Sequence, residues 1–184
     1  MIKKIILIIF TLLLIITQTA FAAEWKFCHA KNFRVHYSLP SSFVEFHPNV
    51  PFSEYAAIDR NLNFSSQLMI VDPTKDSNFS KYDLPKSFSS MKSNELEKYT
   101  QKMLYGIRRY GYDFKDILID VNGRTCFFIG YYFDRNHIKH EALQFIFLEN
   151  YKTVSLQFAF PATADDNYID IAFTAANSLY LDYL

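Results

Sequence analysis

The chain has 184 residues, with 19 basic and 19 acidic side chains, so its formal charge is zero. This balance lacks the excess of Lys and Arg with which nucleic-acid-binding proteins neutralise phosphates, and the sequence therefore predicts no nucleic-acid partner. Half of the residues are hydrophobic and 18% are aromatic. That composition is ample for the core of one domain and is typical of a sheet-rich fold.

Residues 1–22 have the pattern of a cleaved secretory signal peptide. Two lysines precede an apolar run over residues 5–16, and small residues at positions 20 and 22 suit a signal peptidase. The run is shorter than the roughly 20 residues that cross a membrane, so we expect no stable membrane anchor after cleavage. The mature chain, residues 23–184, would carry 19 − 2 = 17 basic and 19 acidic side chains, a net charge of −2.

The two cysteines, Cys28 and Cys126, pose the first question about function. A bacterial lipoprotein has small residues before its modified cysteine, whereas Cys28 follows Lys26 and Phe27, so a lipid anchor is disfavoured. Export to an oxidising compartment makes a Cys28–Cys126 disulfide the favoured interpretation, which would stabilise the fold by on the order of 4 kcal/mol. The alternatives are two buried free thiols or a reactive Cys28. The adjacent His29 would point to the opposite face of an extended chain.

The first part of the mature chain predicts three strands. Polar and apolar residues alternate over 33–40 (FRVHYSLP), and this strand ends at its proline. Shorter strands are expected over 43–47 and 67–72. Residues 73–90, rich in Ser, Asp, Lys and Pro, are expected to form a mobile surface loop.

An amphipathic helix is predicted over residues 91–110. Its apolar side chains recur at steps of three or four residues, at Met91, Leu96, Tyr99, Met103, Ile107 and Tyr110. Gly111 supplies a helix stop, because glycine tolerates the backbone conformation of helix C-terminal caps.

The next segment predicts a four-stranded antiparallel meander. Strands over 116–121 and 124–134 flank Asn122-Gly123, a dipeptide that favours tight hairpin turns. Two more strands are predicted over 140–149 and 152–160. The second of the four is apolar on both faces, which indicates a central strand covered on both sides.

A C-terminal helix is predicted to about residue 182. Thr163 with Asp166 three residues later resembles a helix-capping arrangement, and an apolar stripe follows. The elements together predict a single α+β domain over residues 23–184, with an antiparallel sheet and two main helices packed on it.

This order of elements resembles the PsbP-like fold family, which includes DcrB-like exported envelope proteins of bacteria. The resemblance rests on FRVHYSLPSSF, on Asn-Gly-Arg at 122–124, and on SLQFAFPA followed by a helix ending in NSLYL. It covers most of the mature chain and implies a module that acts by binding partners. The chain departs from DcrB because it lacks a lipid-attachment cysteine.

The sequence contains no strong catalytic motif. It has four glycines, no G-x-S-x-G elbow and no phosphate-binding glycine loop. His137 and His140 with Glu141 form the best candidate metal or hydrolase cluster, but their spacing spans a turn, and a polar hairpin tip is the favoured interpretation. We therefore predict no catalytic residue, metal site or cofactor, and no enzyme.

A concentration of aromatic side chains suggests one alternative activity. Tyr110, Tyr112, Tyr131, Tyr132 and Phe133 would line a cleft for a lipophilic or peptide ligand, or else pack in the core. Core packing is the favoured interpretation.

The leading functional hypothesis is a non-enzymatic accessory protein, periplasmic or secreted by a bacterium, that binds another envelope or secreted protein. The bacterial assignment rests on the form of the leader and on the abundance of Ile, Lys, Asn and Phe. A carrier of a small lipophilic ligand in the aromatic cleft is the alternative, and an unrecognised hydrolase is the second alternative.

Overall fold

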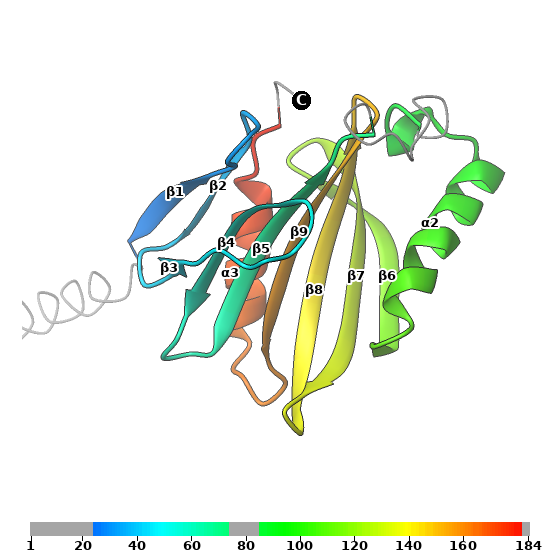
Figure 1. Cartoon of the computed structure of the whole chain (residues 1–184). Helices are drawn as coiled ribbons and strands as arrows, with labels where there is room; N and C mark the ends of the chain where they lie inside the picture. The colour runs from blue at the N-terminus through cyan, green and yellow to red at the C-terminus, as the bar shows by residue number, and fades with distance from the viewer. Residues whose placement is uncertain (1–23, 74–84, 182–184) are drawn as a thin grey trace, which may run out of the picture.

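The computed structural model describes residues 24–73 and 85–181 of the chain. The predicted signal peptide and most of the polar loop predicted over 73–90 therefore lie outside the described residues. The described part is an α+β fold built on one large antiparallel sheet (Figure 1).

The large sheet has seven strands in the order β3-β4-β5-β9-β8-β7-β6. Their bounds are β3 Val44–Glu45, β4 Ser53–Asp59, β5 Phe64–Val71, β6 Tyr112–Val121, β7 Arg124–Arg135, β8 Ile138–Glu149 and β9 Lys152–Pro161. The predicted meander is confirmed as β6 to β9, and every neighbouring pair of strands is antiparallel. β4 was not predicted.

Each hairpin of the meander closes through a two-residue turn whose residues both have positive φ. These are Asn122-Gly123 (53° and 76°), Asn136-His137 (52° and 63°) and Asn150-Tyr151 (48° and 64°). Two consecutive positive φ angles define the type I′ turn, whose twist matches that of the strands that it joins. Asparagine leads each turn because its short polar side chain tolerates the left-handed conformation.

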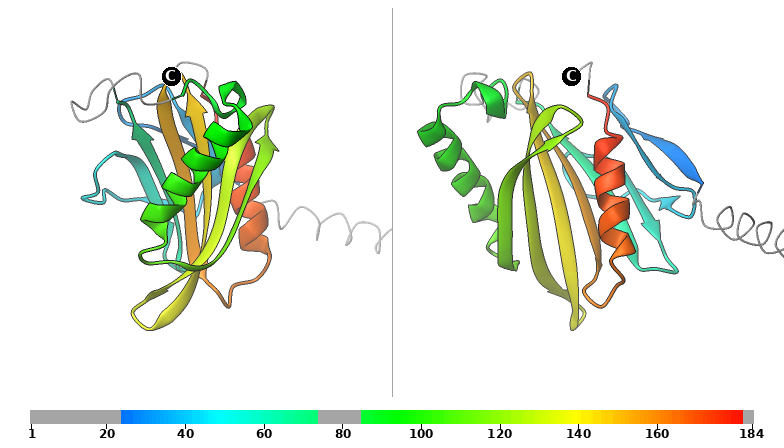
Figure 2. Two further views of the ribbon diagram at one scale, coloured as in Figure 1. Left: turned by 90° about the vertical axis from the view of Figure 1, so that its right-hand side faces the viewer. Right: turned by 180° about the vertical axis from the view of Figure 1, so that it is seen from behind.

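The two helices lie on opposite faces of the sheet (Figure 2). α2 (Ser93–Ile107) contributes to one apolar cluster, and α3 (Asn167–Asn177) contributes to the other. β7 supplies both clusters: Phe127 and Tyr131 belong to the α2 side, whereas Cys126 belongs to the α3 side. The prediction that this strand is covered on both faces is therefore confirmed, but β7 lies second from the edge of the sheet and not at its centre.

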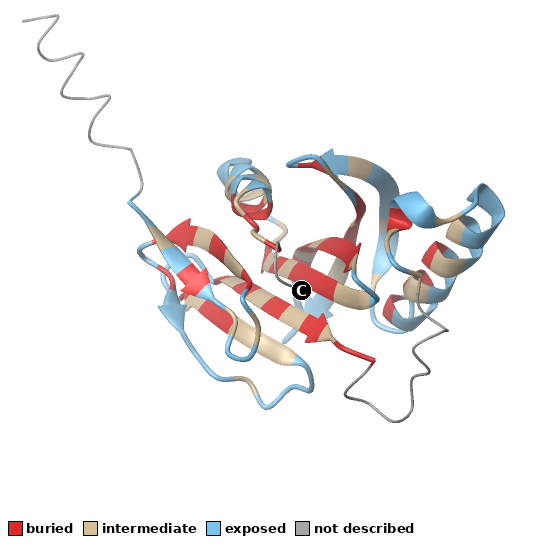
Figure 3. Cartoon of the chain, turned by 90° about the horizontal axis from the view of Figure 1, so that it is seen from above, coloured by how far each residue is buried: buried red, intermediate tan, exposed pale blue. Residues whose placement is uncertain are grey.

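α2 is the more loosely attached of the two helices, because α3 contacts β2, β8 and β9 whereas α2 contacts no single strand as extensively. α2 is shorter than the predicted helix, and its buried residues are Thr100, Leu104 and Ile107. Figure 3 shows exposed residues along most of its outward side, while buried residues concentrate on the sheet. Hollows remain where α2 meets the strands.

α3 begins close to the predicted position, but its N-terminal cap differs from the prediction. Thr163 and Asp166 do not form the capping arrangement. The Asp165 carboxylate accepts a hydrogen bond from the Asn167 amide at 2.9 Å, while the Asp166 side chain makes no capping bond.

A second, two-stranded sheet packs on the α3 side of the large sheet. It consists of β1 (Trp25–His29), which was not predicted, and β2 (His36–Pro40), which is the predicted strand with a later start. The Tyr37 hydroxyl lies 2.8 Å from the Ser66 hydroxyl on β5. After α3 the chain pairs with β2, since the Tyr180 amide donates to the His36 carbonyl at 2.8 Å.

The two glycines around the end of α2 give a matched test of this packing. A Cβ atom at Gly111 would lie 2.6 Å from Cδ2 of Tyr131, whose side chain is buried. We expect Gly111→Ala to lower the free energy of unfolding by about 1–3 kcal/mol. A Cβ atom at Gly106 meets nothing within 4 Å, so Gly106→Ala should raise it by about 0.5–1 kcal/mol.

Urea unfolding of both variants measures these changes. A Gly111→Ala protein as stable as the Gly106→Ala protein would show that the α2 end is not packed against Tyr131 as described.

Candidate functional site

β6 forms an open edge of the large sheet. Within the described residues it pairs only with β7, which leaves the outer backbone groups of a ten-residue strand without a strand partner. Two apolar side chains in its centre are solvent-exposed, Ile117 by 59% and Leu118 by 37%. The opposite edge is β3, which has only two residues. A long apolar edge is a template for pairing with another chain.

The ends of β6 carry features that discourage unspecific pairing, and its centre does not. The register with β7 shifts between Tyr112 and Lys115, and Asp113 has a φ of 54°. At the other end, the Asp120 carboxylate accepts a hydrogen bond from the Gly123 amide at 3.0 Å. Residues 115–121 pair regularly with β7. Residues 116–119 form the central stretch of this open edge.

A groove runs between this stretch and the N-terminal half of α2. Its cavity volume is about 260 Å³. Leu96, Leu118 and Phe127 supply apolar surface, while Glu97 and Asp116 add two carboxylates. Among the described residues neither carboxylate forms an ion pair. The groove therefore favours an apolar segment that carries a basic side chain.

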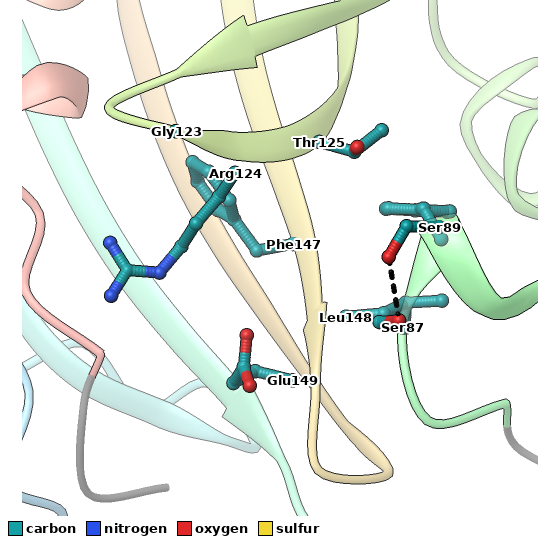
Figure 4. A pocket seen from close by; sticks show the side chains of 9 residues that line it. Ser87, Ser89, Gly123, Arg124, Thr125, Phe147, Leu148 and Glu149 are labelled. Carbon is teal, nitrogen blue, oxygen red and sulfur yellow. Dashed lines mark hydrogen bonds between the residues drawn. The ribbon is translucent and has the colours of Figure 1, made fainter.

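A polar hollow of about 300 Å³ lies at the turn between β6 and β7 (Figure 4). The hydroxyls of Ser87 and Ser89 hydrogen-bond to each other at 3.0 Å. The Arg124 side chain extends away from these hydroxyls. No histidine is among the described residues that line the hollow, so it does not bring a serine nucleophile and a histidine base together.

The structure separates the two histidines of the predicted cluster. His137 lies in the β7–β8 turn, as the polar-tip interpretation expected. His140 does not fit that interpretation, because it is buried and its ring stacks on Phe133 with centroids 5.3 Å apart. Its Nδ1 lies 2.9 Å from the Ile138 carbonyl oxygen. The described residues contain no group of three or more His, Cys, Asp or Glu suited to a metal ion.

The predicted aromatic cleft is not formed as one site. Tyr131 and Tyr132 are neighbours on β7 and so point to opposite faces of the sheet. Tyr131 is buried beside Tyr110, with ring centroids 6.2 Å apart. Tyr132 instead lies beside Tyr112, and Nζ of Lys139 is 3.7 Å from the Tyr132 ring centroid.

Both cysteines are free and buried in the structure, so the predicted Cys28–Cys126 disulfide is not formed in it. Cys28 lies in the two-stranded sheet and Cys126 in the large sheet. Burial raises the pKa of both thiols, for Cys126 to about 12. His29 is exposed where Cys28 is buried, as expected for neighbours on a strand. Neither thiol is placed as a reactive nucleophile.

Two further findings bear on the class of protein. Among the helices within the described residues, none combines the length and the apolar character needed to cross a membrane. Comparison with known proteins finds no matching family model and no matching curated protein. Similarity appears at the level of structure.

The solution structure of cyanobacterial PsbP (CyanoP) from a Synechocystis species matches with a TM-score of 0.57 and 11% identity, over 86% of this chain and 93% of that one. A crystal structure from Bacteroides thetaiotaomicron matches with a TM-score of 0.52 and 10% identity, over 79% of this chain. This chain spans only 44% of the Bacteroides chain. The fold is PsbP-like, as the sequence resemblance implied.

Thiol labelling tests the state of the two cysteines. The thiolate is the reactive form, and burial raises the pKa of both thiols. We therefore expect iodoacetamide to label the native protein at pH 8 at least about 100-fold more slowly than the guanidinium-denatured protein. Rapid native labelling of Cys28 would contradict the burial. If the denatured chain is labelled only after reduction, the bridge predicted from the sequence forms in the exported protein.

Proposed function

We propose that this protein is an exported, non-enzymatic accessory protein of the bacterial cell envelope or secretome that binds another protein at the open edge of β6. The observation that carries the proposal is the exposed, regular central stretch of this edge, residues 116–119, beside a groove with two carboxylates. The leader pattern supports export.

Strand addition is the binding mode that this surface supports. An extended segment of the partner would use its backbone N–H and C=O groups to pair with the outer edge of β6. Successive side chains of an added strand point to opposite faces of the sheet. Those on the α2 side would meet Leu118 and Phe127, and those on the other side would meet Ile117.

Charge would select among possible partner segments. Glu97 and Asp116 lie along the same groove, so a Lys or Arg of the added strand would find two carboxylates there. This interaction is partly solvated and is therefore expected to weaken as salt rises. The partner segment that fits is extended and mainly apolar, with one basic side chain facing α2.

The arrangement of the histidines supports a non-enzymatic role over the hydrolase alternative. The buried His140 is held against Ile138 and Phe133, and His137 lies apart from it in a turn. The serine pair at the β6–β7 turn lacks a histidine among the described residues around it.

Site-specific photo-crosslinking in the producing cell tests the proposal. A benzoylphenylalanine at position 117 should give an adduct of one discrete mass, because this side chain would be covered by the added strand. The same probe at Leu62, which is 42% exposed in the turn between β4 and β5, is the matched control and should give none.

A substitution in the groove tests whether the captured protein binds there. We expect Leu118→Lys to lower the affinity for the captured protein about tenfold, since it removes buried apolar contact. Leu62→Lys should leave the affinity unchanged. Equal adducts at both probe positions, or undiminished binding by Leu118→Lys, would overturn strand addition at β6.

A further inference from the structure

Two histidines face each other across the N-terminal hairpin formed by β1 and β2. The two strands are antiparallel, and His29 lies directly opposite His36. The backbone amide and carbonyl of His36 both pair with Tyr180, on the side of β2 away from β1. His29 and His36 therefore form a non-hydrogen-bonded pair, the type in which opposite side chains stand closest. Their ring centroids are 5.6 Å apart.

The surroundings of the pair orient one ring and leave the other accessible. The His36 ring stacks on the Tyr180 ring, with centroids 4.7 Å apart and planes 20° apart. The Phe27 ring meets the His36 ring edge-on at 5.9 Å. His29 is exposed at the end of β1. Figure 1 shows the hairpin on the side of the molecule remote from α2. The pair is thus half preorganised and open to solvent.

The spacing of the two rings suits a metal ion held between them. Imidazole nitrogen is the commonest protein ligand of transition metals. Zinc binds such a nitrogen at about 2.0–2.1 Å, so two rings on one tetrahedral ion have centroids about 5 Å apart. The observed 5.6 Å is close to that separation. A small rotation of the exposed His29 side chain would bring one nitrogen of each ring onto the same ion.

From these observations we infer that His29 and His36 bind one divalent transition-metal ion of the zinc class, which cross-links β1 to β2. Imidazole suits zinc, copper and nickel, whereas magnesium and calcium prefer oxygen ligands. The described residues contain no group of three or more ligating side chains. Two positions of a tetrahedral ion would therefore be left to water or to a ligand from another molecule.

This inference adds to the sequence-based prediction of no metal site. The two histidines come together only through the pairing of β1, a strand that the sequence did not predict. Within the described residues β1 pairs with no strand other than β2. A bound ion would therefore strengthen the attachment of the first strand of the mature chain. The site is independent of the proposed protein-binding edge at β6.

NMR of the histidine rings tests the inference, with ZnCl₂ added to the mature chain. The chain has five histidines. The ring signals of His29 and His36 should shift together and saturate at one equivalent. The dissociation constant should be on the order of 10 µM, because two ligands supply about half of the binding free energy of a four-ligand site. MgCl₂ should cause no shift. Equal shifts at all five histidines, or none up to about 1 mM zinc, would overturn the site.

Single substitutions locate the ion by calorimetric titration. His29→Gln and His36→Gln should each weaken zinc binding at least tenfold, since each removes one of the two ligands. His137→Gln, in the β7–β8 turn, is the matched control and should bind zinc normally. The exposed His47 lies 3.8 Å from Glu45. An equal loss of binding in His47→Gln would place the ion beside Glu45 and overturn the cross-strand site.

Thermal unfolding tests whether the ion cross-links the two strands. At about 1 mM ZnCl₂, which is about 100 times the expected dissociation constant, the melting temperature should rise by about 5–10 °C. His29→Gln should melt like the unchanged protein without zinc, because this side chain is exposed, and should gain nothing from zinc. An equal rise in His29→Gln would show that zinc acts elsewhere and would contradict the inference.

Discussion

The fold depends on two neighbouring strands that are apolar on both faces, β7 and β8. Along β7, Phe127, Ile129 and Tyr131 pack toward α2, while Cys126 and Phe128 pack toward α3. A strand with this pattern is stable only where both faces are covered. β7 therefore requires a helix on each side, and the two apolar clusters meet through its backbone. A shift of an element packed on one face of β7 therefore changes the packing on its other face.

The two helices, α3 and α2, differ in how completely they cover the faces of the sheet on which they pack. α3 buries alanines against the sheet, which allows close approach, and it is reinforced by the small N-terminal sheet. α2 buries as many residues as α3, but it contacts no single strand as extensively and leaves a hollow at each of its halves. The candidate binding groove follows from this incomplete cover. One hollow continues to the open edge of β6, and the other lies between α2 and the strands β5, β8 and β9.

Local patterns in the sequence predicted the elements whose residues follow one clear period. The helix over 91–110 and the meander were found because their apolar spacing is regular and asparagine marks the turns. β4 was not predicted because Ala56 and Ala57 are consecutive and both buried, which breaks the alternation of buried and exposed residues expected of a strand. The open edge could not be predicted either. The sequence identifies β6 as a strand, but only the order of all seven strands places it at the end of the sheet. The burial of His140 likewise depends on Phe133 across the hairpin.

The contact between the two ends of the described chain constrains the order in which the protein can mature. Tyr180 pairs with His36, and the Ser38 amide donates to the Ser178 hydroxyl at 2.8 Å. Synthesis from the N-terminus makes β2 long before these C-terminal residues. The Ser38 amide therefore lacks its partner, which lies 140 residues later, until most of the described chain has been made. Completion of the N-terminal hairpin thus becomes one of the last steps of folding.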